Sequence, residues 1–318
     1  MVFGVAAPEY NVTGREQEIK RLTRNFREGI NTVLMSPRRI GKTSLVNKVC
    51  RDLVDADIVT VQLDIFSCKT EYEFYNQLSA AVLKQTSSRA EKWMEDAHDF
   101  LARLTPRLTI SPEPNSDFSL SLGITPKTHT PEEVLQLVET IAERKKKRIV
   151  VCIDEFQQVG EFGNSLEAQK RMRSVWQHQR LTSYCLFGSR KHLMSAMFQR
   201  RNMPFYQFGD LMPLGTISAA DWTAYICSHF AERNKTMPED LAEEICRTVD
   251  CYSSYVQQLA WLTFSILEEG ETATKEHLQI AIKDLVAANA MLFMEQTANL
   301  TVYQMNFLRA MADGVDVD

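Results

Sequence analysis

The feature that most constrains this chain is a turn at residues 36–44, which reads Ser-Pro-Arg-Arg-Ile-Gly-Lys-Thr-Ser. The apolar run from Thr32 to Met35 comes directly before it, and a helix-like segment that begins at Leu45 follows it. This order of strand, loop and helix directs consecutive backbone N–H groups and a helix N-terminus at a phosphate group. The segment therefore predicts a triphosphate-binding loop in a parallel α/β domain.

Each residue type in this loop has an expected part. Lys42 reaches the β- and γ-phosphates as a point charge, and the Thr43 hydroxyl binds Mg²⁺. Ser36 stands where the pattern G-x-x-x-x-G-K-S/T has its first glycine, and serine makes this bend if its φ stays negative. A basic strand-to-helix turn is the alternative. The residues predicted to hold the nucleotide are Ser36, Pro37, Arg38, Arg39, Ile40, Gly41, Lys42, Thr43 and Ser44.

A second segment, residues 148–155, is a short apolar run that ends in Asp154 and Glu155. Such a run is typical of a buried parallel strand, whose end delivers side chains to the ligand crevice of an open α/β sheet. Adjacent strand residues point to opposite faces, so we expect the two carboxylates to differ in role. Asp154 is predicted to hold Mg²⁺ through its water shell, and Glu155 to orient and deprotonate the attacking water. The alternative is a strand end followed by an acidic helix cap.

A third polar strand end is Ser189-Arg190, which follows the buried run 183–187 and Gly188. We expect this strand between the phosphate-loop strand and the acidic strand, so that Ser189 or Arg190 senses the γ-phosphate. The alternative is a strand-to-helix cap with a surface arginine. Candidates for an arginine finger offered to a neighbouring subunit are Arg173, Arg180, Arg200 and Arg201, with a solvated turn as the alternative for the last two.

Composition suits a soluble globular protein of two domains, with 318 residues, 44% of them hydrophobic and 24% charged. The net charge of −5 argues against a broadly basic surface for nucleic acid. No apolar run approaches the ~18 residues of a membrane span, and residues 2–7 do not read as a signal peptide. The seven cysteines lack metal-binding spacing, so we expect reduced thiols in a cytoplasmic protein and no metal besides Mg²⁺.

The remaining pattern separates an α/β part from a helical part. A capping box of Thr13 and Glu16 is expected to begin a helix that Gly29 ends. Further expected elements are strands at 58–63 and 211–214, helices at 71–87 and 166–179 and from Pro131, and an inserted hairpin at 107–123. From residue 218 only helices are expected, at 221–232, 238–248, 254–269 and 274–296 and from Thr301, which indicates a separate helical module.

Five motifs together carry a resemblance to a known family. In chain order they are the Thr13-Gly-Arg-Glu box, the loop at 36–44, the I-D-E-F strand end, Gly-Ser-Arg and a Pro-Phe-Tyr turn. The chain resembles an archaeal-type P-loop ATPase of the AAA+/STAND group, a relative of the origin-recognition and initiator-loading ATPases, along essentially its whole length. The resemblance implies a sheet of order 5-1-4-3-2 with helices on both faces, then a helical lid domain and a winged-helix domain. It also implies that Val12, Gly14 and Arg15 lie near the adenine. The sequence departs from the group at Ser36, and at Cys251-Tyr-Ser where the lid usually has Gly-x-Pro.

The predicted organisation is an ATPase domain at 1–216, a lid domain at 217–298 and the first helix of a truncated winged-helix domain at 299–318. The predicted activity is Mg²⁺-dependent hydrolysis of bound ATP to ADP and phosphate, at a rate that the sequence leaves open, which couples nucleotide state to lid movement and partner binding. The alternatives are a nucleotide-gated switch or scaffold with little turnover, and a DNA-associated initiator or mobile-element helper ATPase. Expected partners are a protein client or a second copy through the ATPase domain, with DNA as a further option and no membrane.

Overall fold

The computed structural model describes residues 12–53, 57–86 and 130–312. The chain divides into two compact units, with the boundary between Thr216 and Ile217. The hairpin expected at 107–123 lies outside the described residues. Among the helices within the described ranges, none is both long and apolar enough to cross a membrane.

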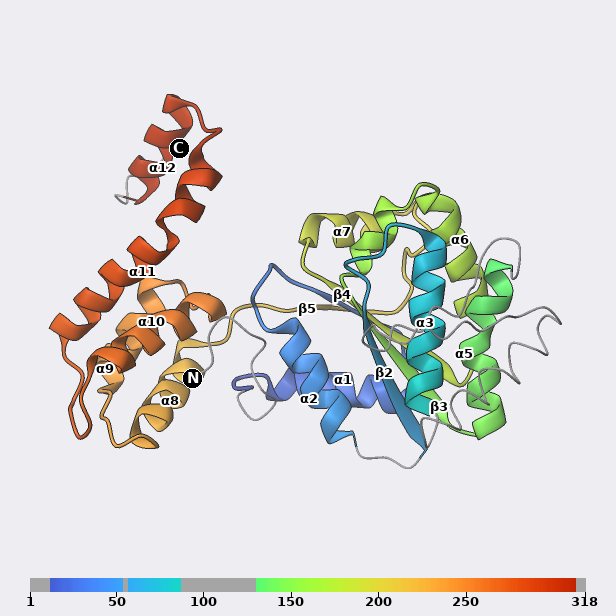
Figure 1. The fold of residues 1–318 in the computed structure, drawn as a ribbon, viewed down its shortest axis with the longest axis horizontal. Helices are drawn as coiled ribbons and strands as arrows, with labels where there is room; N and C mark the ends of the chain where they lie inside the picture. Colours follow the sequence, from blue (N-terminus) through green and yellow to red (C-terminus); the bar gives the residue numbers. More distant parts are fainter. Residues whose placement is uncertain (1–11, 54–56, 87–129, 313–318) are drawn as a thin grey trace, which may run out of the picture. The chain divides into compact units, whose positions relative to one another are not determined.

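A five-stranded parallel sheet forms the centre of the first unit, in the order β2-β3-β4-β1-β5 (Figure 1). The strands are β1 (Thr32–Met35), β2 (Ile58–Asp64), β3 (Arg148–Asp154), β4 (Thr182–Gly188) and β5 (Asp210–Pro213). The predicted order 5-1-4-3-2 is confirmed, and β4 lies between β1 and β3 as expected. Because all five strands are parallel, their carboxyl ends meet at one edge of the sheet.

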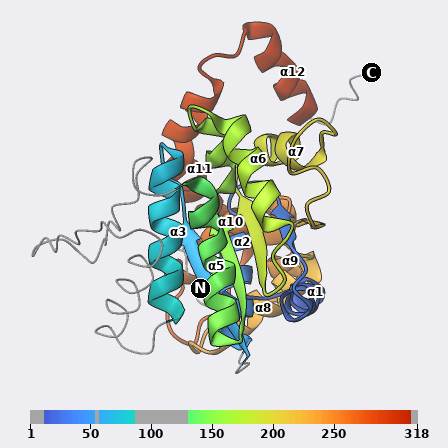
Figure 2. The ribbon, with the colours of Figure 1, turned by 90° about the vertical axis from the view of Figure 1, so that its right-hand side faces the viewer.

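Helices cover both faces of this sheet. Figure 2 shows three of them side by side over one face, namely α3 (Glu71–Thr86), α5 (Pro131–Lys145) and α6 (Ser165–Trp176). The helices α1 (Glu16–Glu28) and α2 (Lys42–Asp52) pack together on the other side of the sheet in Figure 1. Two covered faces explain why the strands read as continuous apolar runs.

The alternation along β3 assigns each side chain to a face. Ile149, Val151 and Ile153 join the core under α3, α5 and α6. Cys152 points to the other face, where its Sγ lies 3.7 Å from Sγ of Cys50 on α2. Burial raises the pKa of the Cys152 thiol, so it stays protonated.

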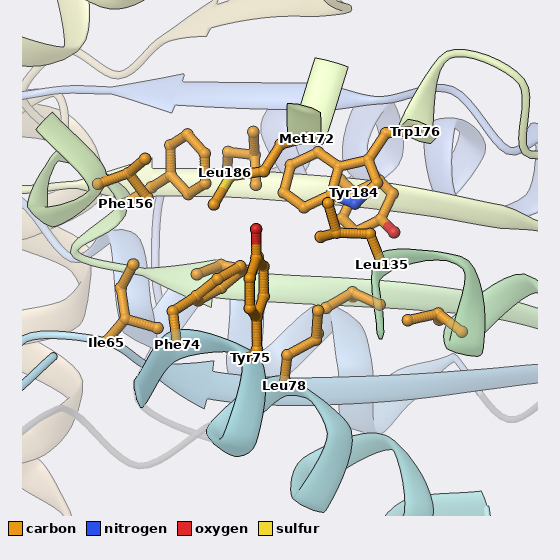
Figure 3. Close-up of a cluster of buried hydrophobic side chains, with 14 of the residues drawn as sticks. Ile65, Phe74, Tyr75, Leu78, Leu135, Phe156, Met172, Trp176, Tyr184 and Leu186 are labelled. Carbon is orange, nitrogen blue, oxygen red and sulfur yellow. The ribbon is translucent and has the colours of Figure 1, made fainter. Parts of the chain in front are cut away.

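Aromatic side chains dominate the core beneath α6 (Figure 3). Trp176 of α6 stacks on Tyr184 of β4 with ring centroids 3.9 Å apart. Phe156 packs against Trp176 at 6.2 Å, and Phe74 and Tyr75 reach the same core from α3. Burying one such side chain contributes roughly 1.5–3 kcal/mol, so this layer holds the sheet rigidly beneath the residues at its carboxyl edge.

The second unit consists of helices. They are α8 (Ala219–Ala231), α9 (Glu239–Thr248), α10 (Ser253–Ile266), α11 (Lys275–Thr297) and α12 (Val302–Ala312). The first four share a separate core, in which Trp222 and Phe230 are the largest fully buried side chains. The predicted helical pattern of this part is confirmed, and Thr301 and Gln304 form a capping box where α12 begins.

The start of α1 differs from the expectation. Arg15 is the N-cap residue, and no side chain from the residues that the structure describes caps the helix, so the predicted capping box of Thr13 and Glu16 is wrong. Gly14 takes the turn with φ +60°, which leaves the Arg15 side chain free to enter the interior. Gly29 ends α1 in the left-handed conformation, as predicted.

Two short elements of the first unit are absent from the helices expected above, although a helix cap was the alternative stated for each of the two strand ends where they begin. The 3₁₀ helix η2 (Phe156–Glu161) follows β3, and α7 (Lys191–Gln199) follows β4. Both are anchored by apolar side chains of the larger core, Phe156 and Val159 from η2 and Met194 and Phe198 from α7. They matter for function because each begins at the carboxyl edge of the sheet.

Candidate functional site

The phosphate loop connects β1 with α2 at the carboxyl edge of the sheet. Its path depends on positive φ angles at Arg39 (59°) and Gly41 (96°), whereas Ser36 is not among the residues with positive φ. Gly41 is the N-cap of α2, and its carbonyl accepts the helix hydrogen bond from Leu45 N at 3.0 Å. The N–H groups in the first turn of α2 are therefore left for an anion, at the positive end of the helix dipole.

Lys42 is 6% exposed, and oxygens of the loop itself hold its ammonium group. Nζ donates to Ser36 Oγ at 3.1 Å, to Ser36 O at 3.2 Å and to Pro37 O at 2.8 Å. Burial lowers the pKa of Lys42, and the nearby charges of Asp154 and Glu155 partly oppose that shift. Within the described part of the chain, this buried cation donates hydrogen bonds to neutral oxygens alone. Such a cation suits an incoming phosphate, because charge-assisted hydrogen bonds are stronger than those to neutral acceptors.

Thr43 and Asp154 meet across 111 residues of sequence. Thr43 Oγ1 donates to Asp154 Oδ2 at 2.7 Å, while Asp154 Oδ1 accepts from Glu155 N at 2.8 Å. Burial raises the pKa of Asp154, and these two hydrogen bonds oppose the shift. Mg²⁺ keeps several waters and takes one or two protein oxygens beside phosphate oxygens. A hydroxyl and a carboxylate side by side fit that requirement.

Glu155 follows directly after the end of β3 and is not part of that strand. β3 ends at Asp154, and Glu155 has a left-handed φ of 54° at the start of η2. The prediction that Asp154 and Glu155 point to opposite faces because both lie in a strand was therefore wrong. A left-handed turn at Glu155 directs the two carboxylates to different places. Oε2 of Glu155 accepts from Ser189 Oγ at 3.0 Å and also from Gln157 Nε2. The carboxylate is thus held beside the end of β4.

The two residues predicted to sense the γ-phosphate have different partners. Ser189 Oγ accepts from Arg38 Nε at 3.2 Å and donates to Glu155, so it connects the phosphate loop with the acidic strand end. Arg190 instead pairs with Glu161 Oε1 at 2.8 Å, on the solvent side of η2. The structure brings Ser189 together with the other candidates, and it engages Arg190 in a separate ion pair.

Arg15 contacts the phosphate loop from outside. This residue is 3% exposed, and its Nη2 donates to Ile40 O at 3.2 Å and to Gly215 O at 2.7 Å. It therefore ties the start of α1 and the segment after β5 to the loop. Val12 and Gly14 lead into Arg15, and the proximity of all three to adenine stays a prediction.

The candidate arginine fingers differ in their exposure, their contacts and their position in the fold. Arg200 and Arg201 are exposed in the turn that follows α7. The guanidinium of Arg173 lies over the Phe208 ring, 5.2 Å from its centroid. Arg180 precedes the amino end of β4, which is the opposite edge of the sheet from the phosphate loop.

Gln157 was not predicted to belong to the site. It is 3% exposed in η2 and donates to Glu155. Gly188, the last residue of β4, leaves space for it, because a Cβ at this position would collide with Gln157 Oε1. The only signal in the sequence was a glutamine two positions after Glu155, which has no meaning until β4 is placed beside η2.

Comparisons of structure find similar folds among archaeal ATPases. A Walker-type ATPase of Pyrococcus abyssi superimposes with a TM-score of 0.65 at 16% identity, covering 92% of this chain and 77% of that chain. The ADP form of the ORC2 protein of Aeropyrum pernix gives 0.58 at 13% identity, covering 88% and 70%. The ORC1 protein of the same organism, solved in complex with DNA, gives 0.55 at 13%, covering 88% and 68%. These likenesses establish the fold.

Comparisons of sequence place the chain in a family. A search among curated proteins gave no match. The family model described as AAA ATPase domain matches residues 11–181, which include the phosphate loop, the acidic strand end and the helices α1, α2, α3, α5 and α6. Since this match covers more than half of the chain, the protein belongs to the AAA ATPase domain family.

Proposed function

We propose that this protein binds MgATP at the phosphate loop and hydrolyses it to ADP and phosphate. Membership of the AAA ATPase domain family supports nucleotide binding and hydrolysis in general. The observation that carries the specific proposal is the hydrogen bond between Thr43 and Asp154, which joins the loop to the acidic strand end. A triphosphatase needs these two groups together, because both act on one Mg²⁺ beside the β- and γ-phosphates.

In this proposal the loop residues 36–44 bind the phosphates through backbone N–H groups and Lys42. Thr43 and Asp154 hold Mg²⁺, which supplies charge neutralisation on the transferred phosphoryl group when it is bound. In this proposal the loop residues, Thr43 and Asp154 therefore bind and orient the nucleotide, and they take no part in proton transfer.

Glu155 acts on the other side of the γ-phosphate. Its carboxylate orients a water molecule for in-line attack and accepts the proton of that water. Ser189 responds to the γ-phosphate, since its hydroxyl already contacts Glu155 and the Arg38 guanidinium. Arg190 reaches the nucleotide only if its ion pair with Glu161 breaks, so we place it second to Ser189.

A pair of substitutions tests this function. Lys42→Ala should abolish ATP binding in equilibrium titration, while Glu155→Gln should bind ATP and hydrolyse it poorly. Lys48→Ala is the matched control, because Lys48 lies on the same helix and its ammonium pairs with Asp52 at the surface, at 2.7 Å. Wild-type turnover in Glu155→Gln would remove Glu155 from the role of general base.

A nucleotide-gated switch with little turnover is the second candidate, as in the STAND group. It uses the same phosphate loop and Mg²⁺ ligands and differs from the first candidate only in the rate of turnover. In either case we propose that the helical unit responds to nucleotide state and that a protein client or a second copy binds. Turnover per molecule that rises with protein concentration, and that falls in Arg200→Ala or Arg201→Ala, would indicate assembly with a finger supplied in trans.

DNA binding is a further candidate function, and the similarity of fold is its main support. The ORC1 protein of Aeropyrum pernix was solved in complex with DNA, and α12 occupies the place that we assign to the first helix of a winged-helix domain. The net charge of −5 weighs against it. Affinity for duplex DNA that falls steeply with added salt would support this function, and its absence at low salt would exclude it.

A further inference from the structure

One carboxylate oxygen of Glu155 takes both of the side-chain hydrogen bonds that the described residues make to this group. Ser189 Oγ and Gln157 Nε2 each donate to Oε2. Ser189 belongs to the end of β4, whereas Gln157 belongs to η2, so the two donors approach from different elements. This arrangement fixes the plane of the carboxylate and leaves Oε1 as the proton acceptor.

Gln157 is a polar residue in a buried position beside Glu155. Its side chain is 3% exposed, and its Oε1 has no hydrogen-bond partner among the described residues. A buried carboxamide oxygen without a partner costs stability, so the place of this side chain beside Glu155 calls for an explanation. The carboxamide is also wedged against the backbone of Gly188, where a Cβ would collide with Oε1 and approach Cδ to 3.0 Å.

We propose that Gln157 is the positioning residue that orients Glu155 toward the attacking water, and that Gly188 is glycine because only a bare backbone admits the Gln157 carboxamide. The inference rests on the proposed hydrolysis of ATP. Gln157 acts through Glu155, so its loss reduces turnover and leaves nucleotide affinity nearly unchanged.

A double-mutant cycle tests the proposal. Gln157→Ala should lower kcat by about tenfold or more, with the Kd for ATP changed by less than about twofold. Gly188→Ala should lower kcat in the same direction, because the new methyl group displaces the end of a flexible side chain. The double variant should be hardly slower than Gln157→Ala alone, since the collision with the Gln157 carboxamide is then gone and the nearest remaining atom is Met194 Sδ at 3.3 Å, in a flexible side chain. Rescue by Gln157→Asn is not expected, because the shorter side chain does not reach Glu155.

Two controls separate positioning from folding. Gln179→Ala removes another buried glutamine, which donates to Leu135 O at 3.0 Å and accepts from Tyr184 Oη at 2.8 Å near the opposite end of β4. Gly163→Ala adds a methyl group that meets nothing within 4 Å. Both should retain the wild-type kcat, and thermal unfolding should show that all variants are folded.

The outcomes are distinguishable. Wild-type kcat in folded Gln157→Ala, or losses in kcat that multiply in the double variant, would overturn this inference and leave the proposed ATPase intact. ATP binding without any hydrolysis by the wild type, in single-turnover reactions at high protein concentration, would overturn the hydrolytic function and this inference together. Non-multiplying losses confined to kcat would support it.

Discussion

The hydroxyl of Thr43 donates to the carboxylate of Asp154 at 2.7 Å, so the first turn of α2 and the end of β3 are joined directly by their side chains. Both residues stand at element ends whose backbone is fixed by the sheet and by the core below it. The oxygens proposed to bind Mg²⁺ are therefore pre-organised, which lowers the cost of assembling the site.

The Thr43 hydroxyl gives the first prediction. Thr43→Ala should lower MgATP turnover by at least about tenfold, because an oxygen ligand and its hydrogen bond to Asp154 are both lost. Thr43→Ser keeps the hydroxyl and should retain most of the activity. The measurement is turnover against Mg²⁺ concentration, and an unchanged Mg²⁺ dependence in Thr43→Ala would contradict the assignment.

The strand end at 189–190 gives the second prediction. Ser189→Ala removes hydrogen bonds to both Glu155 and Arg38, whereas Arg190→Ala breaks an exposed pair with Glu161. We expect a loss of turnover of about tenfold for Ser189→Ala and a clearly smaller one for Arg190→Ala, since exposed ion pairs contribute ~1 kcal/mol or less. Steady-state kinetics of the two variants decide between the sensors, and the reverse order would assign the role to Arg190.

The contact between α1 and β5 gives a prediction of acid stability. The hydrogen bond from Arg21 lowers the pKa of Asp210, with a further bond from Asn25. A lowered carboxylate pKa stabilises the folded state above the ordinary value of 3.8, and the contribution is lost as the pH falls through the lowered value. Asp210→Asn should therefore lower the free energy of unfolding at neutral pH by ~1 kcal/mol or less, and so lower the unfolding temperature. The difference in unfolding temperature between variant and wild type should vanish below about pH 4.

The control for this pH dependence is Glu167→Gln. Glu167 pairs with Lys170 at 2.8 Å within a single helix and is exposed. Its removal should change the unfolding temperature less than Asp210→Asn does. A gap for Asp210→Asn that stays constant between neutral and acid pH would show that the Arg21 pair does not act through the charge of the carboxylate.

The stack of Trp176 on Tyr184 gives the fourth prediction. Trp176→Ala should destabilise the first unit by about 3–5 kcal/mol, because it empties a fully buried site between α6 and β4. Trp261→Ala, at a residue that is 41% exposed on α10, should cost far less. Denaturant unfolding followed by circular dichroism measures both variants, and equal losses would contradict the importance assigned to this layer.

Much of the site was predictable because its signals are local. The loop at 36–44 combines an apolar strand, glycine and lysine at fixed spacing, and residue types at fixed spacing determine where a backbone bends and where its N–H groups point. The same holds for the acid pair after β3 and for Ser189 after β4. Since parallel strands share an edge, recognising three strand ends was enough to predict that they converge.

Other features depend on partners distant in sequence. Thr13 and Glu16 form a capping-box pattern, yet Arg15 is the N-cap residue; its guanidinium donates to the carbonyls of Ile40 and Gly215 and pairs with Glu18. Tertiary contacts of a buried charge outweigh a local capping preference of about 1 kcal/mol. The 3₁₀ helix after Glu155 was missed for the same reason, since buried contacts of Phe156 hold it in place.

The order of residues along the chain was sufficient to predict a parallel sheet and the strand ends that meet at its carboxyl edge, because periodicity and spacing are properties of neighbouring residues. The full strand order came from the resemblance to AAA+/STAND ATPases, and the binding of a triphosphate at that edge is a proposal. Only the tertiary structure decided which oxygen of Glu155 is held, that Gln157 holds it, and that Gly188 makes room for Gln157. These relationships join η2 to β4 through side chains, and no local pattern encodes the distance between two elements that fold together.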